Sequence, residues 1–331
     1  MGRAVFLIHE KKEEPVMKKL LAVLLAMSLM LCIAAASAAE GTWRIGICQL
    51  VQHVALDAAT QGFQDALTQK LGDRVSFDVQ NASGDSSTCS AIVNNFISGN
   101  VDLIMANATP ALQAAVAATG EIPVLGTSVT DYATALDIDN WTGATGINVS
   151  GTSDLAPLAQ QADMLHELFP EAKKVGLLYC SAEPNSKYQV NVITGFLTAL
   201  GYECAEYTFA DSNDVASVTQ NACDGCDVLY IPTDNTAASC TEAIRNVLEP
   251  AKKPAVVGEE GICAGCGVAT LSISYYDLGY ATGEMAYEVL VNGADISAMD
   301  VRFAPSVTKE YNAEMCALLG IQIPADYVPI Q

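Results

Sequence analysis

Short apolar runs alternate with segments of helical periodicity along most of this 331-residue chain. The run Trp43–Gln49 predicts a first strand. From Leu56 to Leu71, apolar residues recur three and four positions apart, which is the spacing of one buried helix face. The same alternation continues as far as Val291. It is typical of α/β folds in which helices cover a parallel sheet.

The other predicted elements follow the same rule of short β-rich runs between helical periods. The predicted strands are Val75–Gln80, Val101–Met105, Pro123–Gly126, Gly143–Val149, Lys174–Tyr179, Glu203–Phe209, Asp227–Ile231, Ala255–Gly258 and Gly267–Ser272. The predicted helices are Ser87–Gly99, Pro110–Ala118, Leu155–Phe169, Gln189–Leu200, Val215–Ala222, Thr236–Leu248 and Asp277–Val291.

This alternation runs through the chain twice, with a short polar stretch between the two series. We therefore expect two doubly wound parallel-sheet lobes, each of a usual domain size. Lobe 1 would comprise residues 43–151 plus 275–302, and lobe 2 residues 152–274 plus 303–331. Three crossing strands would join the lobes. Ligands bind at the carboxyl ends of strands in such sheets, so a ligand cleft is expected between the lobes.

The first 38 residues have the features of a secretory signal. Lys18–Lys19 precedes an apolar run, Leu20–Ala34, and Ala36–Ala38 supplies the small-residue pattern of a cleavage site. Met17 is then the predicted start. Cys32 lacks the small preceding residue of a lipidation site, so we expect a soluble, exported protein, periplasmic or otherwise extracytoplasmic. No later stretch has the roughly 20 apolar residues of a membrane span.

The charge of the chain narrows the choice of partners. Its formal net charge is −22 at pH 7. Nucleic acids and anionic lipid surfaces bind clustered lysine and arginine, so this charge argues against both as partners. It does not identify a ligand.

Ten cysteines follow the signal segment, and four of them form two Cys-x-x-Cys pairs, Cys223/Cys226 and Cys263/Cys266. An even number of cysteines in an exported protein favours structural disulfides. Alternatively, the four thiolates could hold one zinc ion, although the interval between the pairs is long for that site. Free thiols are the third alternative. We favour disulfides, and the pairing cannot be deduced.

Polar residues gather where predicted strands end and helices begin. Thr109 precedes Pro110 at a helix start, where backbone N–H groups and the helix dipole can receive a carboxylate. Asp234 offers an anionic acceptor to an ammonium group. Either residue could instead be an ordinary helix cap. The candidate ligand-binding residues are Gln49, Gln52, His53, Ala108, Thr109, Thr130, Asp131, Glu183, Asn185, Asp234, Asn235, Glu259 and Asp277.

Sequence motifs of common enzymes are not found. Only His53 and His166 follow the signal segment, and no nucleophile elbow accompanies them. A phosphate-binding loop and the glycine-rich dinucleotide fingerprint are also missing. We therefore expect a binding protein without catalytic residues, metal or cofactor, with an enzyme as the least favoured alternative.

An ordered set of short motifs resembles a known family. The set is Ile45-Gly46-Ile47, Gln52-His53, Ala55-Leu56-Asp57, Asp102-Leu103-Ile104, Ala108-Thr109-Pro110-Ala111, Val129-Thr130-Asp131, Val175-Gly176, Tyr179, Glu183-Pro184-Asn185-Ser186, Pro232-Thr233-Asp234-Asn235-Thr236, Tyr275-Tyr276-Asp277-Leu278-Gly279 and Asn312. Together these motifs resemble the substrate-binding proteins of ATP-driven (ABC) importers, of the tryptophan/tyrosine-binding type. That family has the type I periplasmic-binding fold.

The resemblance implies a protein that closes on its ligand by a hinge motion and delivers it to an ABC permease in the membrane. We expect it to be a monomer. It also implies that Thr109 and Thr130 hold a carboxylate and that Asp234 holds an amino group. The ligand would be a zwitterion such as an amino acid, with an aromatic one as the narrower expectation. Gln52 and Tyr132 depart from the family pattern, which expects an acid and a proline there. A sensor that presents the same cleft to a receptor is the alternative.

Overall fold

The computed structural model describes Met1 and residues 41–330. The predicted signal segment, including Met17 and Cys32, lies outside the described residues. Among the described helices, none is both long enough and apolar enough to cross a bilayer.

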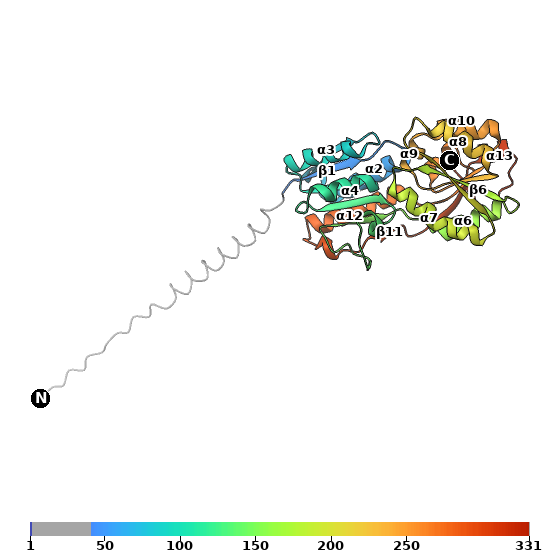
Figure 1. The fold of residues 1–331 in the computed structure, drawn as a ribbon. Helices are drawn as coiled ribbons and strands as arrows, with labels where there is room; N and C mark the ends of the chain where they lie inside the picture. The colour runs from blue at the N-terminus through green and yellow to red at the C-terminus, as the bar shows by residue number, and fades with distance from the viewer. Residues whose placement is uncertain (2–40, 331) are drawn as a thin grey trace. The chain divides into compact units, whose positions relative to one another are not determined.

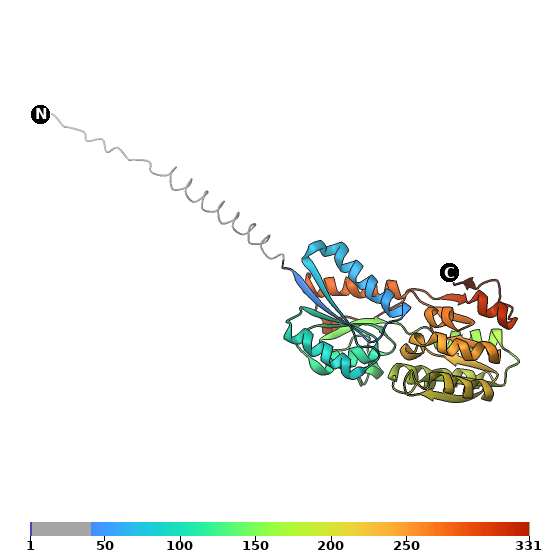
Figure 2. The ribbon, with the colours of Figure 1, turned by 90° about the horizontal axis from the view of Figure 1, so that it is seen from above.

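Lobe 1 is built on a six-stranded sheet with the order β11-β5-β4-β3-β1-β2, and all its strand pairs are parallel. Its strands are β1 (Trp43–Gln49), β2 (Val75–Asn81), β3 (Leu103–Asn107), β4 (Val124–Val129), β5 (Val149–Ser153) and β11 (Arg302–Phe303). Helices α3 (Ser86–Ser98) and α4 (Thr109–Ala118) share the apolar core of one face. Helices α2 (Val54–Leu71) and α12 (Tyr275–Leu290) cover the other (Figures 1 and 2).

Lobe 2 is built on a seven-stranded sheet with the order β13-β12-β10-β9-β8-β6-β7. Only the β10–β12 pair is antiparallel. Its strands are β6 (Lys174–Cys180), β7 (Glu203–Phe209), β8 (Val228–Ile231), β9 (Ala255–Val257), β10 (Ala269–Ser272), β12 (Thr308–Tyr311) and β13 (Val328–Pro329). Helices α6 (Leu158–Leu168) and α7 (Pro184–Ala199) pack on one face, and α8 (Val215–Gly225) and α10 (Thr241–Ala251) on the other.

The central strands are almost entirely buried because helices cover both faces of each sheet. Every residue of β3, β8, β9 and β10 is buried, whereas the edge strands β2 and β7 are largely exposed. Helices α2 and α12 pack closely because glycine lies at their contact. A Cβ atom added to Gly279 would overlap the carbonyl oxygen of Ala59.

The chain passes between the two sheets three times. It leaves sheet 1 after β5, returns from β10 into α12, and leaves again from β11 into β12. The predicted α/β class, with two parallel-sheet lobes and three crossings, is confirmed. We propose that each sheet with its helices forms one lobe, with limits slightly different from those expected, since β5 and β11 extend lobe 1 to Ser153 and Phe303.

Three predicted elements are wrong in detail. The helix predicted to begin at Gln189 begins earlier, at Pro184, the first residue of α7. The predicted strand Gly143–Val149 is displaced, since β5 begins at Val149 and residues 143–148 contribute one isolated bridge, at Ala144. Gly143 and Gly146 have φ values of 111° and 73°, which are incompatible with an extended strand. The predicted helix Thr236–Leu248 is divided into α9 (Asn235–Ser239) and α10 at Cys240. The short elements α5 (Tyr132–Ala135), α11 (Glu260–Gly265) and α13 (Ala313–Leu319) were not predicted.

All ten cysteines among the described residues are free thiols, so the favoured disulfide interpretation is wrong. Eight of them are buried, and they pack as small apolar side chains in the cores of the two lobes. Burial raises the pKa of Cys180, Cys223 and Cys316 to about 11, which keeps these thiols neutral. Within residues 41–330, no group of side chains is arranged to hold a metal ion.

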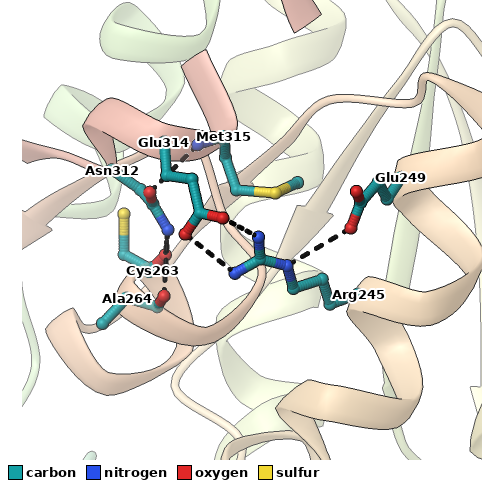
Figure 3. A network of polar contacts seen from close by, with 7 residues as sticks. All are labelled: Arg245, Glu249, Cys263, Ala264, Asn312, Glu314 and Met315. Carbon is teal, nitrogen blue, oxygen red and sulfur yellow. Dashed lines mark hydrogen bonds and ion pairs between the residues drawn. The ribbon is translucent and has the colours of Figure 1, made fainter. Parts of the chain in front are cut away.

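Polar contacts fasten the C-terminal helix α13 to lobe 2 (Figure 3). The Asn312 side chain caps α13 at Met315 N and donates to the carbonyl oxygens of Cys263 and Ala264 in α11, both at 2.9 Å. Arg245 of α10 forms a two-point ion pair with Glu314, the shorter contact being 2.6 Å. These contacts join α10, α11 and α13 within lobe 2.

Candidate ligand-binding site

Residues from both lobes line two hollows between the strand ends of the two sheets. One has a volume of about 160 Å³ and is lined by Leu50 and Pro110 from lobe 1 and by Glu183 and Asn235 from lobe 2, among others. The second is narrower, and Thr109 and Asp131 there face lobe 2 residues of α7, including Asn185. The region between the two sets of carboxyl strand ends is therefore the candidate ligand-binding site.

The lobe 1 side of this region carries buried hydroxyl groups without partners. Ala108 has a φ of 90°, and this turn leads β3 directly into α4. The hydroxyl of Thr109, the first residue of α4, is buried and has no hydrogen-bond partner, and the same holds for Ser128 at the end of β4. Since the first N–H groups of a helix lack intrahelical partners, this rim offers hydrogen-bond donors to an anion.

A buried acid follows the next strand, β5. Asp154, directly after β5, accepts hydrogen bonds from Thr130 at 3.1 Å and from the phenol of Tyr275 at 2.9 Å. Burial raises the pKa of Asp154 to about 6. The hydroxyl of Thr130 is thus already bonded to a carboxylate, unlike that of Thr109. Asp131 accepts from Thr134 N and caps α5.

The lobe 2 side carries buried carboxylates. Asp234 is 1% exposed, and it accepts hydrogen bonds from Cys180 N, Ser186 Oγ and Ala237 N at 2.7–2.8 Å. Burial is the main cause that raises the pKa of Asp234 to about 8, and the charge of nearby Glu183 adds to it. A group with this pKa is stabilised by any positive charge that reaches it.

Glu183 organises the neighbouring loops. Its carboxylate accepts from the backbone and side chain of Asn235 and of Thr236, at 2.6–3.0 Å, so it caps α9 from outside the helix. It also accepts from Asn185 Nδ2 at 3.1 Å. The Oδ1 atom of Asn185 is buried without a partner.

A side-chain hydrogen bond between His53 and Asn235 joins the lobes across the cleft. His53, at the start of α2, contacts Asn235 at 3.3 Å between Nε2 and Oδ1. Its other ring nitrogen, Nδ1, is buried and has no partner. Desolvation lowers the pKa of His53, while Asn235, Glu183 and Asp57 oppose that shift.

The structure therefore brings together most of the residues that the sequence suggested, but four of them line other hollows. Gln49 and Gln52 line a separate hollow on lobe 1, where the Gln49 side chain bonds to Thr60 and Asp57. Glu259 and Asp277 line a further hollow, of about 390 Å³, whose lining also includes Val54 of lobe 1 and Glu310 of lobe 2. Glu259 caps α11 there, and burial raises its pKa to about 7.

Sequence reasoning missed Ser128 and Asp154. Ser128 has a φ of 55° and precedes the motif that was singled out, so only its backbone conformation marks it. Asp154 follows β5 directly, but the prediction ended that strand at Val149 and began a helix at Leu155. A correct strand end would have identified it as a residue of the cleft rim.

Comparison with known proteins gives consistent results. Residues 44–328 match the family model described as ABC transporter substrate binding protein. A curated relative, the tyrosine-binding protein of Clostridioides difficile, is 39% identical over 249 residues, which are 74% of this chain and 72% of the relative.

Solved structures match over nearly the same region. An ABC domain from Streptococcus pneumonia in complex with L-Trp has a TM-score of 0.82 and 31% identity, covering 86% of this chain and 97% of that one. The ligand-free, open structure of a substrate-binding protein with adhesive properties from Clostridium difficile has a TM-score of 0.65 and 36% identity, covering 87% and 100%. A leucine-binding protein from Thermotoga maritima, at 15% identity and a TM-score of 0.54 over 73% and 81%, shares the fold.

Proposed function

Because this chain belongs to the family of ABC transporter substrate-binding proteins, we propose that it captures a free amino acid outside the cytoplasm and delivers it to a membrane permease. The observation that carries this proposal is the opposite chemistry of the two cleft rims. Lobe 1 presents unpartnered hydroxyls at a helix N-terminus, and lobe 2 presents buried carboxylates. A zwitterion that spans the cleft satisfies both rims at once.

The carboxylate of the ligand binds at the start of α4. Thr109 and Ser128 have buried hydroxyls that the protein leaves without partners. A buried polar group without a hydrogen bond costs about 1–3 kcal/mol, and a ligand carboxylate removes that cost. The ten residues of α4 add the favourable field of a helix N-terminus. Thr130, which the sequence also suggested, supports this rim through Asp154.

The ammonium group of the ligand binds at the lobe 2 rim. An ionised carboxylate has about four lone-pair positions, and internal donors use three at Asp234. Within residues 41–330, no lysine or arginine is among the donors to Asp234 or Glu183. An ammonium group supplies the missing positive charge, and it can donate to Asp234 and to the free Oδ1 of Asn185.

The arrangement of the lobes supports capture by closure. Identity is higher to the open, ligand-free relative (36%) than to the L-Trp complex (31%), yet the TM-score is lower, at 0.65 against 0.82. Such an order of scores results when the lobes lie as they do in the liganded protein. The hydrogen bond between His53 and Asn235 connects the two lobes in this closed form.

We further propose an aromatic amino acid as the ligand. The names of two relatives, a tyrosine-binding protein and a domain in complex with L-Trp, support this choice. The hollow beside Pro110 is lined partly by apolar side chains, including Leu50, Val51 and Ala182, which suits the body of an aromatic ring. We expect the protein to act as a monomer, with the permease as its macromolecular partner and without nucleic acid or a cofactor.

A ligand screen tests this proposal. The purified chain without its first 38 residues is heated with each of the twenty amino acids, and the melting temperature is measured. We expect L-tyrosine, L-tryptophan or L-phenylalanine to raise it most. A dissociation constant near 1 µM corresponds to about −8 kcal/mol, and ligand at 100 times that constant stabilises the fold by about 2.7 kcal/mol. No stabilisation by any amino acid would disprove the proposal.

A further inference from the structure

A chain of four hydrogen-bonded side chains crosses the cleft. Nδ2 atoms of Asn185 and Asn235 both donate to the same oxygen of Glu183, Oε2, at 3.1 and 2.6 Å. Asn235 then accepts through Oδ1 from Nε2 of His53, in the other lobe, at 3.3 Å. Each end of this chain is an atom that is buried without a partner: Oδ1 of Asn185 and Nδ1 of His53.

The bonds within this series of four side chains determine whether each terminal atom is a hydrogen-bond donor or acceptor. The Asn235 amide donates to Glu183, so its Oδ1 is an acceptor and Nε2 of His53 must carry the hydrogen. In a neutral imidazole the other nitrogen is then a bare acceptor. Nδ1 does not cap its own helix, since His53 makes no side-chain capping bond. The Asn185 amide donates to Glu183, Ser186 and Thr233, which leaves its Oδ1 as an acceptor too.

We propose that Nδ1 of His53 and Oδ1 of Asn185 accept two N–H bonds of the ligand ammonium from opposite lobes, while Asp234 accepts the third. The inference rests on the proposed function and deepens it. The hydrogen bond to Asn235 joins His53 to the other lobe, and it holds the free ring nitrogen in the acceptor tautomer. Closure and recognition of a primary ammonium group are thus coupled through one imidazole.

Two consequences distinguish this arrangement from charge attraction alone. First, affinity depends on the number of N–H bonds, so N-methylation of the ligand weakens binding although the charge stays. Second, a protonated His53 has no free acceptor. Glu183 and Asp57 face the ring and favour its protonation, but burial opposes it more strongly. Protonation of His53, at a pH below the ordinary histidine pKa of about 6.5, therefore weakens binding beyond the effect of protonating Asp234.

Substitutions at His53 provide the first test. The dissociation constant for L-tyrosine is measured by calorimetry at pH 7.5 and pH 5.5. We expect His53→Phe to weaken binding at least tenfold at pH 7.5, because phenylalanine neither donates to Asn235 nor accepts from the ligand. His53→Gln retains part of the affinity and weakens less than wild type between pH 7.5 and pH 5.5, since glutamine has both groups but does not titrate. The weakening that remains in this variant arises from Asp234, whose pKa is raised to about 8.

His166→Gln is the matched control. His166 is the other histidine among the described residues, and it bonds to Tyr202 within lobe 2 at 2.8 Å. We expect this variant to keep the wild-type affinity and its pH dependence. Melting temperatures of all three variants without ligand show whether any loss of binding arises from unfolding.

The second test uses N-methyl and N,N-dimethyl L-tyrosine. Wild type should lose affinity at each step, and His53→Phe should lose distinctly less, because one acceptor is already gone. If folded His53→Phe binds L-tyrosine within twofold of wild type, the inference is wrong while the proposed function stands. If wild type binds no amino acid, the proposed function itself has failed.

Discussion

The two cleft rims differ in how their buried polar groups are hydrogen-bonded. At the lobe 1 rim, neutral hydroxyls of Thr109 and Ser128 are buried with no partner. At the lobe 2 rim, Asp234 and Glu183 are buried with three and five internal donors respectively. The first rim therefore lacks an acceptor, and the second lacks a positive charge.

This difference indicates how the orientation of a ligand is chosen. Both rims belong to the same kind of strand-to-helix junction, so the fold alone makes them equivalent. A hydroxyl without a partner can bind a cationic or an anionic group, but at a helix N-terminus it favours an anionic group. The carboxylates of the lobe 2 rim repel an anionic group. A zwitterion thus has one favourable orientation across the cleft.

The largest effect is expected from removal of the charge on the lobe 2 rim. Asp234→Asn keeps an acceptor for the cap of α9 but leaves the ligand ammonium without a counter-charge. Breaking a buried charge pair costs about 3–5 kcal/mol, so L-tyrosine affinity should fall at least a hundredfold. Calorimetry measures the loss. Asp85→Asn, at the exposed cap of α3, is the control and should bind normally. Wild-type affinity in Asp234→Asn would contradict the assignment.

A second prediction concerns the buried acids without ligand. The pKa values of Asp154, Glu259 and Asp234 are raised to about 6, 7 and 8, so these groups favour the folded state when protonated. Their contribution is present below about pH 4 and is lost as the pH rises to 8. For Asp154 alone the loss is about 3 kcal/mol.

Urea unfolding at pH 5 and pH 7.5 measures this dependence. We expect the free energy of unfolding to be smaller at pH 7.5 in wild type and to change less in Asp154→Asn. Asp73→Asn alters an exposed acid of lobe 1 and should follow wild type. An Asp154→Asn profile parallel to wild type would show that burial of this acid costs nothing.

Two threonine substitutions are expected to affect ligand affinity and stability separately. Thr109→Val removes a hydroxyl that has no protein partner, so affinity should fall about tenfold with little change in stability. Thr219→Val removes a buried hydroxyl that donates to Val215 O at 2.7 Å within α8, so stability should fall by about 1 kcal/mol with normal affinity. Melting curves with and without L-tyrosine measure both. Equal behaviour of the two variants would contradict the lobe 1 assignment.

The smallest effect is expected at Gln52. Its side chain is exposed and lines a hollow made only of lobe 1 residues. Gln52→Ala should change the L-tyrosine affinity less than twofold, as measured by calorimetry. A tenfold loss would show that residues after β1, as well as those at the start of α4, contribute to ligand affinity.

Much of this molecule could be predicted from local patterns. Strands β1 and β7 begin and end where periodicity placed them, and the α/β class follows from the alternation of strands and helices. Thr109, Asp234, Glu183 and Asn185 were predicted as site residues because they occupy strand-to-helix junctions. Their placement in the ligand site remains a prediction, but their burial at the rims makes it specific.

Local patterns failed where the outcome depended on distant partners. The position of β5 depends on the glycine conformations before it and on its pairing with β4. Because the strand was predicted too early in the sequence, Asp154 was not recognised as a residue that follows a strand. The cysteines lie in apolar cores as free thiols, which spacing along the chain cannot reveal. Gln49 ends β1 and His53 directly precedes α2, yet the first is bonded within lobe 1 and the second reaches Asn235 in lobe 2.

The sequence by itself determined the alternation of elements, the two series of strand ends and the residue types at each end, because these depend on side chains a few positions apart. Only the tertiary structure decided which hydroxyls and ring nitrogens are left without a partner. Hydrogen-bond satisfaction is a property of groups that lie far apart in the chain, such as His53 and Asn235, and burial makes each missing partner costly.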